Sequence, residues 1–203
     1  MWFEEAPYCG LPSAEALGDL EATAAGGVYI SQGDVECCFY QFELPQKLKQ
    51  YFGLPLVRGR FLPPSLRHRL GVGLDEEVRF RCRVIPMGWS WAVKWVQEIH
   101  QEVFRRACIP GPWILDKRPT SGVDESMGAK ALYIDNFASF EVSGSHAEDQ
   151  RDKMLKALAD AGIVAHSEGE TTQDGDFLGF SLVRGDEWRL SRRRFWKIVL
   201  ALR

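Results

Sequence analysis

The chain lacks the features that would assign it to several common classes of protein. No apolar run in its 203 residues approaches the roughly 18 residues of a membrane-spanning helix. The acidic, aromatic beginning does not resemble a secretory signal, and there is no internal repeat or low-complexity tract. We therefore expect a globular protein inside the cell, in the cytoplasm or the nucleus, with no membrane partner.

Cysteine and histidine are few and are poorly placed for a disulfide framework or a zinc site. The five cysteines are an odd number, and the neighbours Cys37 and Cys38 would face opposite sides of a strand. No cysteine pair has the spacing of a zinc knuckle, and the four histidines show no zinc-like pairing. These patterns favour reduced thiols and argue against a transition-metal site.

Lysine and arginine are absent from residues 1–33, although this stretch carries five acidic residues. All 25 basic residues lie in the rest of the chain, against 23 acidic ones. The N-terminal stretch therefore offers no cations for an anionic substrate, and basic patches must be sought further along.

Two acidic segments are candidates for phosphoryl-transfer chemistry. We interpret Asp34 as the end of a strand that is followed by a turn. Asp135 and Asn136 interrupt the apolar segment 130–140, and an Asp-Asn pair tolerates the positive φ angles of a tight hairpin, so we expect Asp135 at an exposed hairpin tip. Carboxylates from two adjacent strands can bridge a pair of magnesium ions. Taken singly, however, each aspartate is most often only a turn residue.

Four motifs, in order, resemble the palm of a reverse transcriptase, the RNA-directed DNA polymerase of retroelements and retroviruses. Asp34 with Phe39 resembles the first motif, residues 85–89 (Ile-Pro-Met-Gly-Trp) with Gln97 the second, and residues 133–136 (Tyr-Ile-Asp-Asn) the third. Residues 177–180 (Phe-Leu-Gly-Phe) resemble the turn that contacts the primer strand. The resemblance extends from Asp34 to about Leu190.

The resemblance implies templated addition of deoxynucleotides to a primer 3′ end with two Mg²⁺ or Mn²⁺ ions. Asp34 and Asp135 would hold the metals, with Asn136 as a further ligand. The incoming deoxynucleoside triphosphate would contact Phe39, which would exclude ribonucleotides, and also Met87 and Gly88. The primer-template would contact residues that include Tyr133, Leu178 and Gly179.

Several positions depart from the family pattern. Asn136 stands where the family has a second acid, and Met87 and Trp91 stand where it usually has glutamine and a small residue. The segment 163–176 contains no lysine to protonate the leaving pyrophosphate, so His166 is the only nearby substitute, although we interpret it first as an exposed loop histidine.

Two basic patches could contact nucleic acid. Arg79, Arg81 and Arg83 alternate with apolar residues, which predicts a strand with one arginine face that could follow a phosphate backbone. The final residues, from Arg192 onward, predict a basic amphipathic helix. The alternative for both patches is a solvated face that keeps the domain in solution.

Helical spacing predicts two long helices. The first has an apolar stripe of Ala92, Val96, Ile99, Val103 and Ala107, and a connecting loop over residues 109–129 follows it. The second begins at a capping box of Ser145 and Glu148, carries the stripe Met154, Leu155, Leu158 and Ala161, and stops at Gly162. Segments 177–183 and 187–190 read as a hairpin.

Together these elements predict an α+β fold with a polymerase palm-like antiparallel sheet and helices packed on one face. We expect residues 1–33 to form a partial fingers-like segment, residues 34–190 the reverse-transcriptase-like palm, and residues 191–203 the start of a thumb-like helix. Further segments of a longer polyprotein are possible partners.

Two other hypotheses stay open beside an active polymerase module. The first is a catalytically inactive retroelement remnant that at most binds nucleic acid. The second and weaker one is an unrelated α+β protein-interaction module in which the order of the motifs is chance.

Overall fold

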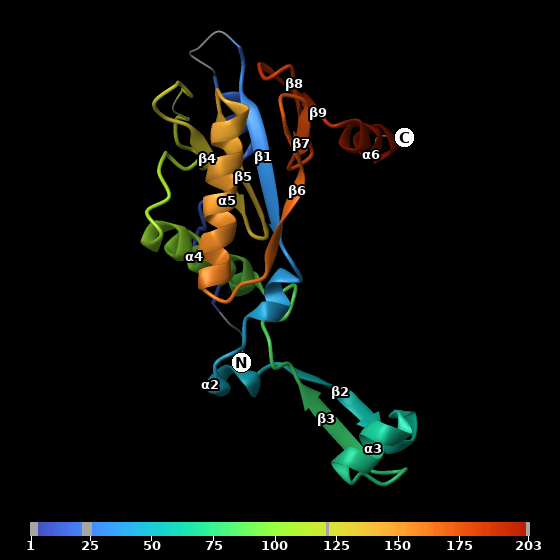
Figure 1. Ribbon diagram of the computed structural model, residues 1–203. Helices are drawn as coiled ribbons and strands as arrows, with labels where there is room; N and C mark the ends of the chain where they lie inside the picture. Colours follow the sequence, from blue (N-terminus) through green and yellow to red (C-terminus); the bar gives the residue numbers. More distant parts are fainter. Residues whose placement is uncertain (1–3, 22–25, 121, 202–203) are drawn as a thin grey trace. The chain divides into compact units, whose positions relative to one another are not determined.

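The structure is a computed structural model that describes residues 4–21, 26–120 and 122–201 (Figure 1). The chain forms two compact units, of which one comprises residues 1–38 and 93–203 and the other residues 39–92. The second unit is thus inserted into the first. Neither of the boundaries expected from the sequence, after residue 33 and after residue 190, separates these units.

The larger unit is built on a four-stranded antiparallel sheet. Its strands are β1 (Tyr29–Val35), β4 (Ala129–Tyr133), β5 (Asn136–Glu141) and β6 (Ala165–Thr172), in the order β4-β5-β1-β6. Helix α4 (Ser90–Arg106) connects back to β4, and α5 (Gly144–Asp160) connects β5 to β6. The parallel strands β1 and β4 therefore have β5 between them, which is the split βαβ arrangement. The predicted α+β class with antiparallel sheet is confirmed.

The two long helices cover one face of this sheet. Helix α5 lies along β1, β5 and β6 (Figure 1) and buries Met154 and Leu158 completely. Phe104 of α4 packs against Phe137 of β5, with ring centroids 5.9 Å apart. The Phe137 ring in turn lies over Gly33, where a Cβ atom would stand only 2.2 Å from it. Gly33 is therefore required for close packing next to Asp34.

The opposite face of the sheet is partly covered by smaller elements. These are α1 (Ala14–Gly18) and a three-stranded antiparallel sheet of β7 (Gly175–Phe177), β8 (Phe180–Val183) and β9 (Glu187–Leu190). They form a core in which Leu17, Phe177 and Leu182 meet Ile30 and Phe140 of the large sheet. Helices therefore do not pack on one face alone. Helix α6 (Arg192–Ala201) follows β9 and buries none of its residues.

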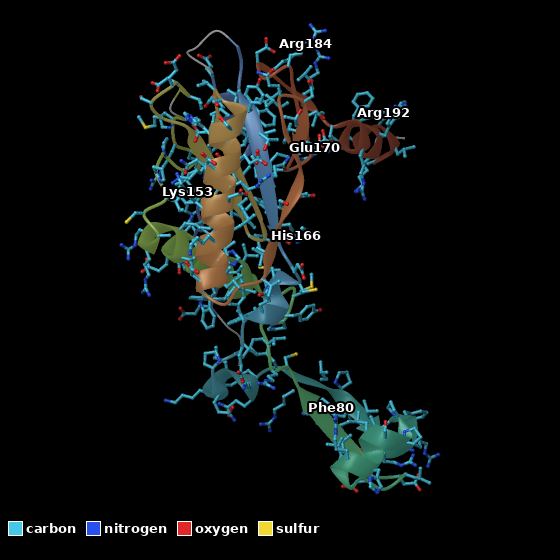
Figure 2. All side chains as sticks on the ribbon, in the orientation of Figure 1. Phe80, Lys153, His166, Glu170, Arg184 and Arg192 are labelled. Carbon is cyan, nitrogen blue, oxygen red and sulfur yellow. The ribbon has the colours of Figure 1, made fainter. Side chains whose placement is uncertain are left out.

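The inserted unit contains a two-stranded antiparallel ribbon. The ribbon is formed by β2 (Gly53–Arg58) and β3 (Glu77–Arg81). The other elements of this part of the chain are η1 (Cys38–Gln41), α2 (Gln46–Lys49), η2 (Gly59–Phe61) and α3 (Pro64–Leu70). The predicted alternation on β3 is confirmed, because Arg79 and Arg81 are exposed whereas Val78 and Phe80 are half-buried. Figure 2 labels Phe80 on this strand. Arg83 lies beyond the end of the strand.

Both long helices were predicted, but their details differ. The row of α4 that is buried is Ala92, Val96, His100 and Phe104, while Ile99 and Ala107 are exposed. A stripe chosen by hydrophobicity misses His100. This polar ring can be buried because its Nδ1 is hydrogen-bonded to the Ile134 carbonyl. The N-cap of α5 is Ser143 rather than a Ser145–Glu148 capping box, since Glu148 pairs with Arg151 instead.

The predicted hairpin near the end of the chain is confirmed, because β8 and β9 pair in antiparallel register on either side of residues 184–186, but its first strand is shorter than predicted. Segment 177–183 is not one strand, because Leu178 and Gly179 form a tight turn between β7 and β8 with φ angles of 51° and 81°. The predicted loop is confirmed, as no helix or strand lies between α4 and β4 in the residues described there. Within the described ranges, no helix is both long enough and apolar enough to cross a membrane.

Candidate active site

Strand pairing brings the two predicted catalytic aspartates together. Asp34 lies directly opposite Asn136 in the β1–β5 register, and the Val35 N–H donates a 2.9 Å hydrogen bond to the Asp135 carbonyl oxygen. Tyr133 pairs with Asn136, and residues opposite each other share a face of the sheet. The side chains of Asp34, Asn136 and Tyr133 therefore lie on the sheet face that α4 and α5 do not cover.

The β4–β5 hairpin turn lies one residue earlier than the sequence predicted. Tyr133 and Asn136 are its flanking pair, so Ile134 and Asp135 are its two central residues. The positive φ angle, 60°, is at Ile134 and not at the Asp-Asn pair. A β-branched residue in this region is strained, and such strain persists only where the surroundings hold it.

Two buried side chains of α4 hold this turn. Gln97 Oε1 accepts a 2.8 Å hydrogen bond from the Ile134 N–H, and Gln97 Nε2 donates one of 2.8 Å to the Leu132 carbonyl. His100 Nδ1 donates to the Ile134 carbonyl at 2.8 Å, which assigns the ring proton to Nδ1. Gln97 belongs to the second motif, but His100 was missed. The signal for it was a second polar residue three positions after Gln97 on a helix that is otherwise apolar on its inner side.

The carboxylates of the site interact with one another. Burial raises the pKa of Asp34, and the negative charges of Asp135 and Glu168 add to the increase, while His166 opposes it. Burial, with the charges of Asp135 and Asp34, raises the pKa of the Cys38 thiol to about 12, so this thiol stays neutral. Burial lowers the pKa of His100. The site thus concentrates negative charge at Asp34, Asp135 and Glu168, with the neutral Cys38 thiol beside it.

These residues fit a magnesium ion that the substrate helps to hold. In the part of the chain that the structure describes, no three His, Cys, Asp or Glu side chains are grouped to hold a metal ion. Magnesium in polymerase-type sites is bound by only one or two carboxylates, with substrate phosphates and water completing the coordination. A divalent cation between Asp34 and Asp135 would also relieve the repulsion that raises the pKa of Asp34.

Asn136 changes the chemistry of the pair. Its Nδ2 donates a 2.8 Å hydrogen bond to Asp135 Oδ1. The position therefore supplies a hydrogen-bond donor to its neighbour where a carboxylate would supply a metal ligand. This contact orients Asp135 and engages one of its two oxygens.

His166 lies beside the pair but in a strand. It is the cross-strand partner of Asp34 on β6 (Figure 2), so the expected loop position is wrong, although the expected exposure is correct. Its Nδ1 lies 3.5 Å from Glu36 Oε1. His166 is thus the cation nearest to Asp34 along the β1–β6 pairing when it is protonated.

The predicted nucleotide-binding residues belong to the inserted unit, whereas Asp34 and Asp135 belong to the larger one. Phe39 is half-buried in η1, and Met87 is 66% exposed with its sulfur 3.8 Å from the Tyr40 hydroxyl. Gly88 has a φ angle of 89°, and no atom lies within 4 Å of the position of a Cβ. A glycine at position 88 is therefore explained by the positive φ angle of its backbone and not by close packing.

The Leu178–Gly179 turn closes the β7–β8 hairpin of the larger unit. Arg194 of α6 lies against it, because Arg194 donates a 2.8 Å hydrogen bond to the Leu178 carbonyl. Arg194 was not identified from the sequence as a contact of this turn, since it depends on how α6 follows β9.

Charge is divided unequally between the two units. Residues 39–92 hold nine Lys and Arg against four Asp and Glu, a net charge of +5, whereas the other residues sum to −8. Arg83 lies 3.5 Å from Glu43, but Arg79 and Arg81 form no ion pair with any residue whose position is described. Basic residues therefore outnumber acidic ones in the insertion and not in the larger unit.

Comparison with known proteins does not assign a family. No protein-family model matches the chain, and no curated protein matches it in sequence.

Proposed function

We propose that the chain is a reverse-transcriptase-like module with a palm-like fold, which adds deoxynucleotides to a primer 3′ end on an RNA or DNA template. The observation that carries the proposal is the pairing of Asp34 on β1 with the Asp135 hairpin, at one end of one sheet face. The electrostatic coupling of the two carboxylates supports it, as does the split βαβ order of the sheet.

In this proposal Asp34 and Asp135 hold the divalent metal ions. Bound Mg²⁺ supplies activation of the primer 3′ hydroxyl and neutralisation of phosphate charge. Gln97 and His100 fix the hairpin so that Asp135 keeps its position. Phe39 excludes ribonucleotides, and Met87 and Gly88 contact the deoxynucleoside triphosphate, as the resemblance implies.

Primer-template binding is assigned to the turn at Leu178 and Gly179, to Tyr133, and to the arginines of the insertion. Arg79 and Arg81 are exposed without ion-pair partners among the described residues, so they are available for phosphate oxygens. The net charge of +5 on residues 39–92 supports this assignment.

Primer extension on an RNA template, with Mg²⁺ or Mn²⁺, tests the proposal. We expect extension by the wild type and its loss in Asp34→Asn and Asp135→Asn, because each change removes a metal-binding carboxylate while conserving size. Asp160→Asn, at the exposed end of α5, is the matched control and should extend normally. Equal extension by wild type and Asp34→Asn would sink the proposal.

A second candidate function is nucleic-acid binding without polymerisation, by an inactive retroelement remnant. The specific observation in its favour is the hydrogen bond from Asn136 to Asp135, which engages an oxygen that a metal would need. This candidate predicts no extension by the wild type but salt-dependent binding of oligonucleotides. The third interpretation, a protein-interaction module, predicts neither.

A further inference from the structure

Arg194 is held in one conformation by three contacts with the β7–β8 turn. Its guanidinium donates to the Leu178 carbonyl at 2.8 Å and lies 4.9 Å from the centre of the Phe180 ring. A Cβ atom at Gly179 would stand 2.9 Å from Arg194 Cδ, so the glycine leaves the space that the arginine chain uses. The Gly179 carbonyl also accepts a 3.0 Å hydrogen bond from the Ser191 N–H, which ties the start of α6 to the same turn.

The two residues before Arg194 in the sequence are also arginines. Arg192, labelled in Figure 2, precedes Arg193 and Arg194, and all three are exposed. None of them forms an ion pair with a carboxylate in the ranges that the structure describes, whereas Arg189 on β9 pairs with Glu187 at 2.6 Å. Cations in the first turn of a helix face the positive end of its dipole, so the stability of α6 does not explain them.

A fixed arginine is suited to a phosphate. A guanidinium has five N–H donors in a rigid fork, and among the described residues one hydrogen bond, to the Leu178 carbonyl, uses a donor of Arg194. Because the side chain is already ordered, little conformational entropy remains to be lost when an anion binds. Phe195 and Trp196, which follow directly, are 47% and 51% exposed and offer aromatic faces for unpaired bases.

We propose that Arg194, together with Arg192 and Arg193, forms a phosphodiester-binding site for a single nucleic-acid strand beside the Leu178–Gly179 turn. The identification of this strand as the primer rests on the proposed function. The anchoring of Arg194 to a backbone turn favours one fixed phosphate over a membrane surface, where a basic helix needs freely moving side chains.

The test is equilibrium binding of a fluorescently labelled single-stranded oligonucleotide to the full chain, in EDTA and over a series of salt concentrations. The slope of log K against log salt is negative, and each lost phosphate contact reduces its magnitude by about 0.7 for a single strand. We expect that decrease, with weaker binding, for Arg194→Ala and for Arg192→Ala. Arg189→Ala is the matched control, because its charge is neutralised by Glu187, and it should keep the wild-type slope. Arg194→Lys keeps the charge without the fork and should bind more weakly than wild type while retaining the slope.

The outcomes separate the site from the polymerase proposal, since EDTA excludes catalysis. A reduced slope in Arg194→Ala with no extension by the wild type would leave the site in place and remove the polymerase. Extension by the wild type with unchanged slopes in folded Arg194→Ala and Arg192→Ala would overturn the site alone. The site is also wrong if Arg194→Ala loses binding only to vesicles of anionic lipid, or if millimolar inorganic phosphate competes equally with the oligonucleotide at every salt concentration.

Discussion

The surroundings of Asp34 oppose its ionisation, and this affects the free energy of unfolding. Its pKa is raised in the folded protein by burial and by Asp135, so the folded state binds the proton more tightly than the unfolded chain does. Ionised Asp34 therefore destabilises the fold at pH values above its folded pKa, and the penalty disappears below the pKa of the unfolded chain. We expect Asp34→Asn to have a higher Tm than wild type at pH 7, measured by thermal denaturation.

The pH dependence supplies the control for this prediction. The difference in Tm between Asp34→Asn and wild type should shrink as the pH falls, because the wild-type carboxyl becomes protonated. Asp160→Asn should show no such gain, since Asp160 pairs with Lys156 on the surface of α5. A variant that is less stable than wild type at pH 7 would show that Asp34 is held by favourable contacts, contrary to this account.

Individual site residues differed in how far the sequence could reveal them. Asp34 and Asp135 were visible because motif order and hairpin chemistry are local properties. The role of His100 was not visible, because a histidine can be buried as a hydrogen-bond donor only where the fold places an acceptor opposite it. Here that acceptor is the Ile134 carbonyl. Arg194 was likewise hidden, because its partner Leu178 is reached only through the turn from β9 into α6.

At the scale of elements, the β4–β5 hairpin depends on a helix that is distant in sequence. Gln97→Leu would leave the Ile134 N–H and the Leu132 carbonyl without their partner in a buried site. Each unsatisfied buried group costs roughly 1–3 kcal/mol, so for two groups we expect a loss of about 2–6 kcal/mol in the free energy of unfolding. Urea denaturation measures this loss, and primer extension by the folded fraction should fall because Asp135 is displaced.

Gln101→Leu is the matched control on the same helix. Gln101 is half-buried, and no side-chain hydrogen bond of it is described, so the change should alter the free energy of unfolding by no more than about 0.5 kcal/mol. Equal effects of the two substitutions would mean that the hairpin does not rely on Gln97.

The elements themselves were predictable where periodicity was strong, as in α4, α5 and the alternating strand β3. Their ends were not. The turn at Ile134 and Asp135 moved by one residue because tertiary hydrogen bonds from α4 outweigh the preference of an Asp-Asn pair for positive φ. Residues 177–180 resemble a turn of the reverse-transcriptase family, but local pattern alone predicts one strand over 177–183. The turn is hidden from that pattern because Leu178 is an apolar residue at a position that usually takes Asn or Gly.

At the scale of the whole molecule, the inserted unit was the largest feature that the sequence did not reveal. The segment 39–92 starts within η1 and finishes within α4, so no loop rich in Gly, Ser or Pro marks its ends in the sequence. Its separation follows from which residues contact each other, and that is not a local property of the sequence. The basic patch at Arg79 and Arg81 was nevertheless recognisable, because alternation along a strand is local.

The unequal charge of the two units predicts where nucleic acid binds. Arg79→Glu/Arg81→Glu reverses two exposed cations that have no described ion-pair partner, on the unit with a net charge of +5. We expect weaker binding of primer-template duplex and a decrease of about 0.9 per lost phosphate contact in the magnitude of the salt slope. Arg105→Glu/Arg106→Glu makes the same change in net charge on α4, where both arginines already pair with Glu102. Filter binding over a salt series measures both double variants, and the smaller slope should belong to the first alone. Equal losses would show that binding follows net charge and not the arginine face of β3.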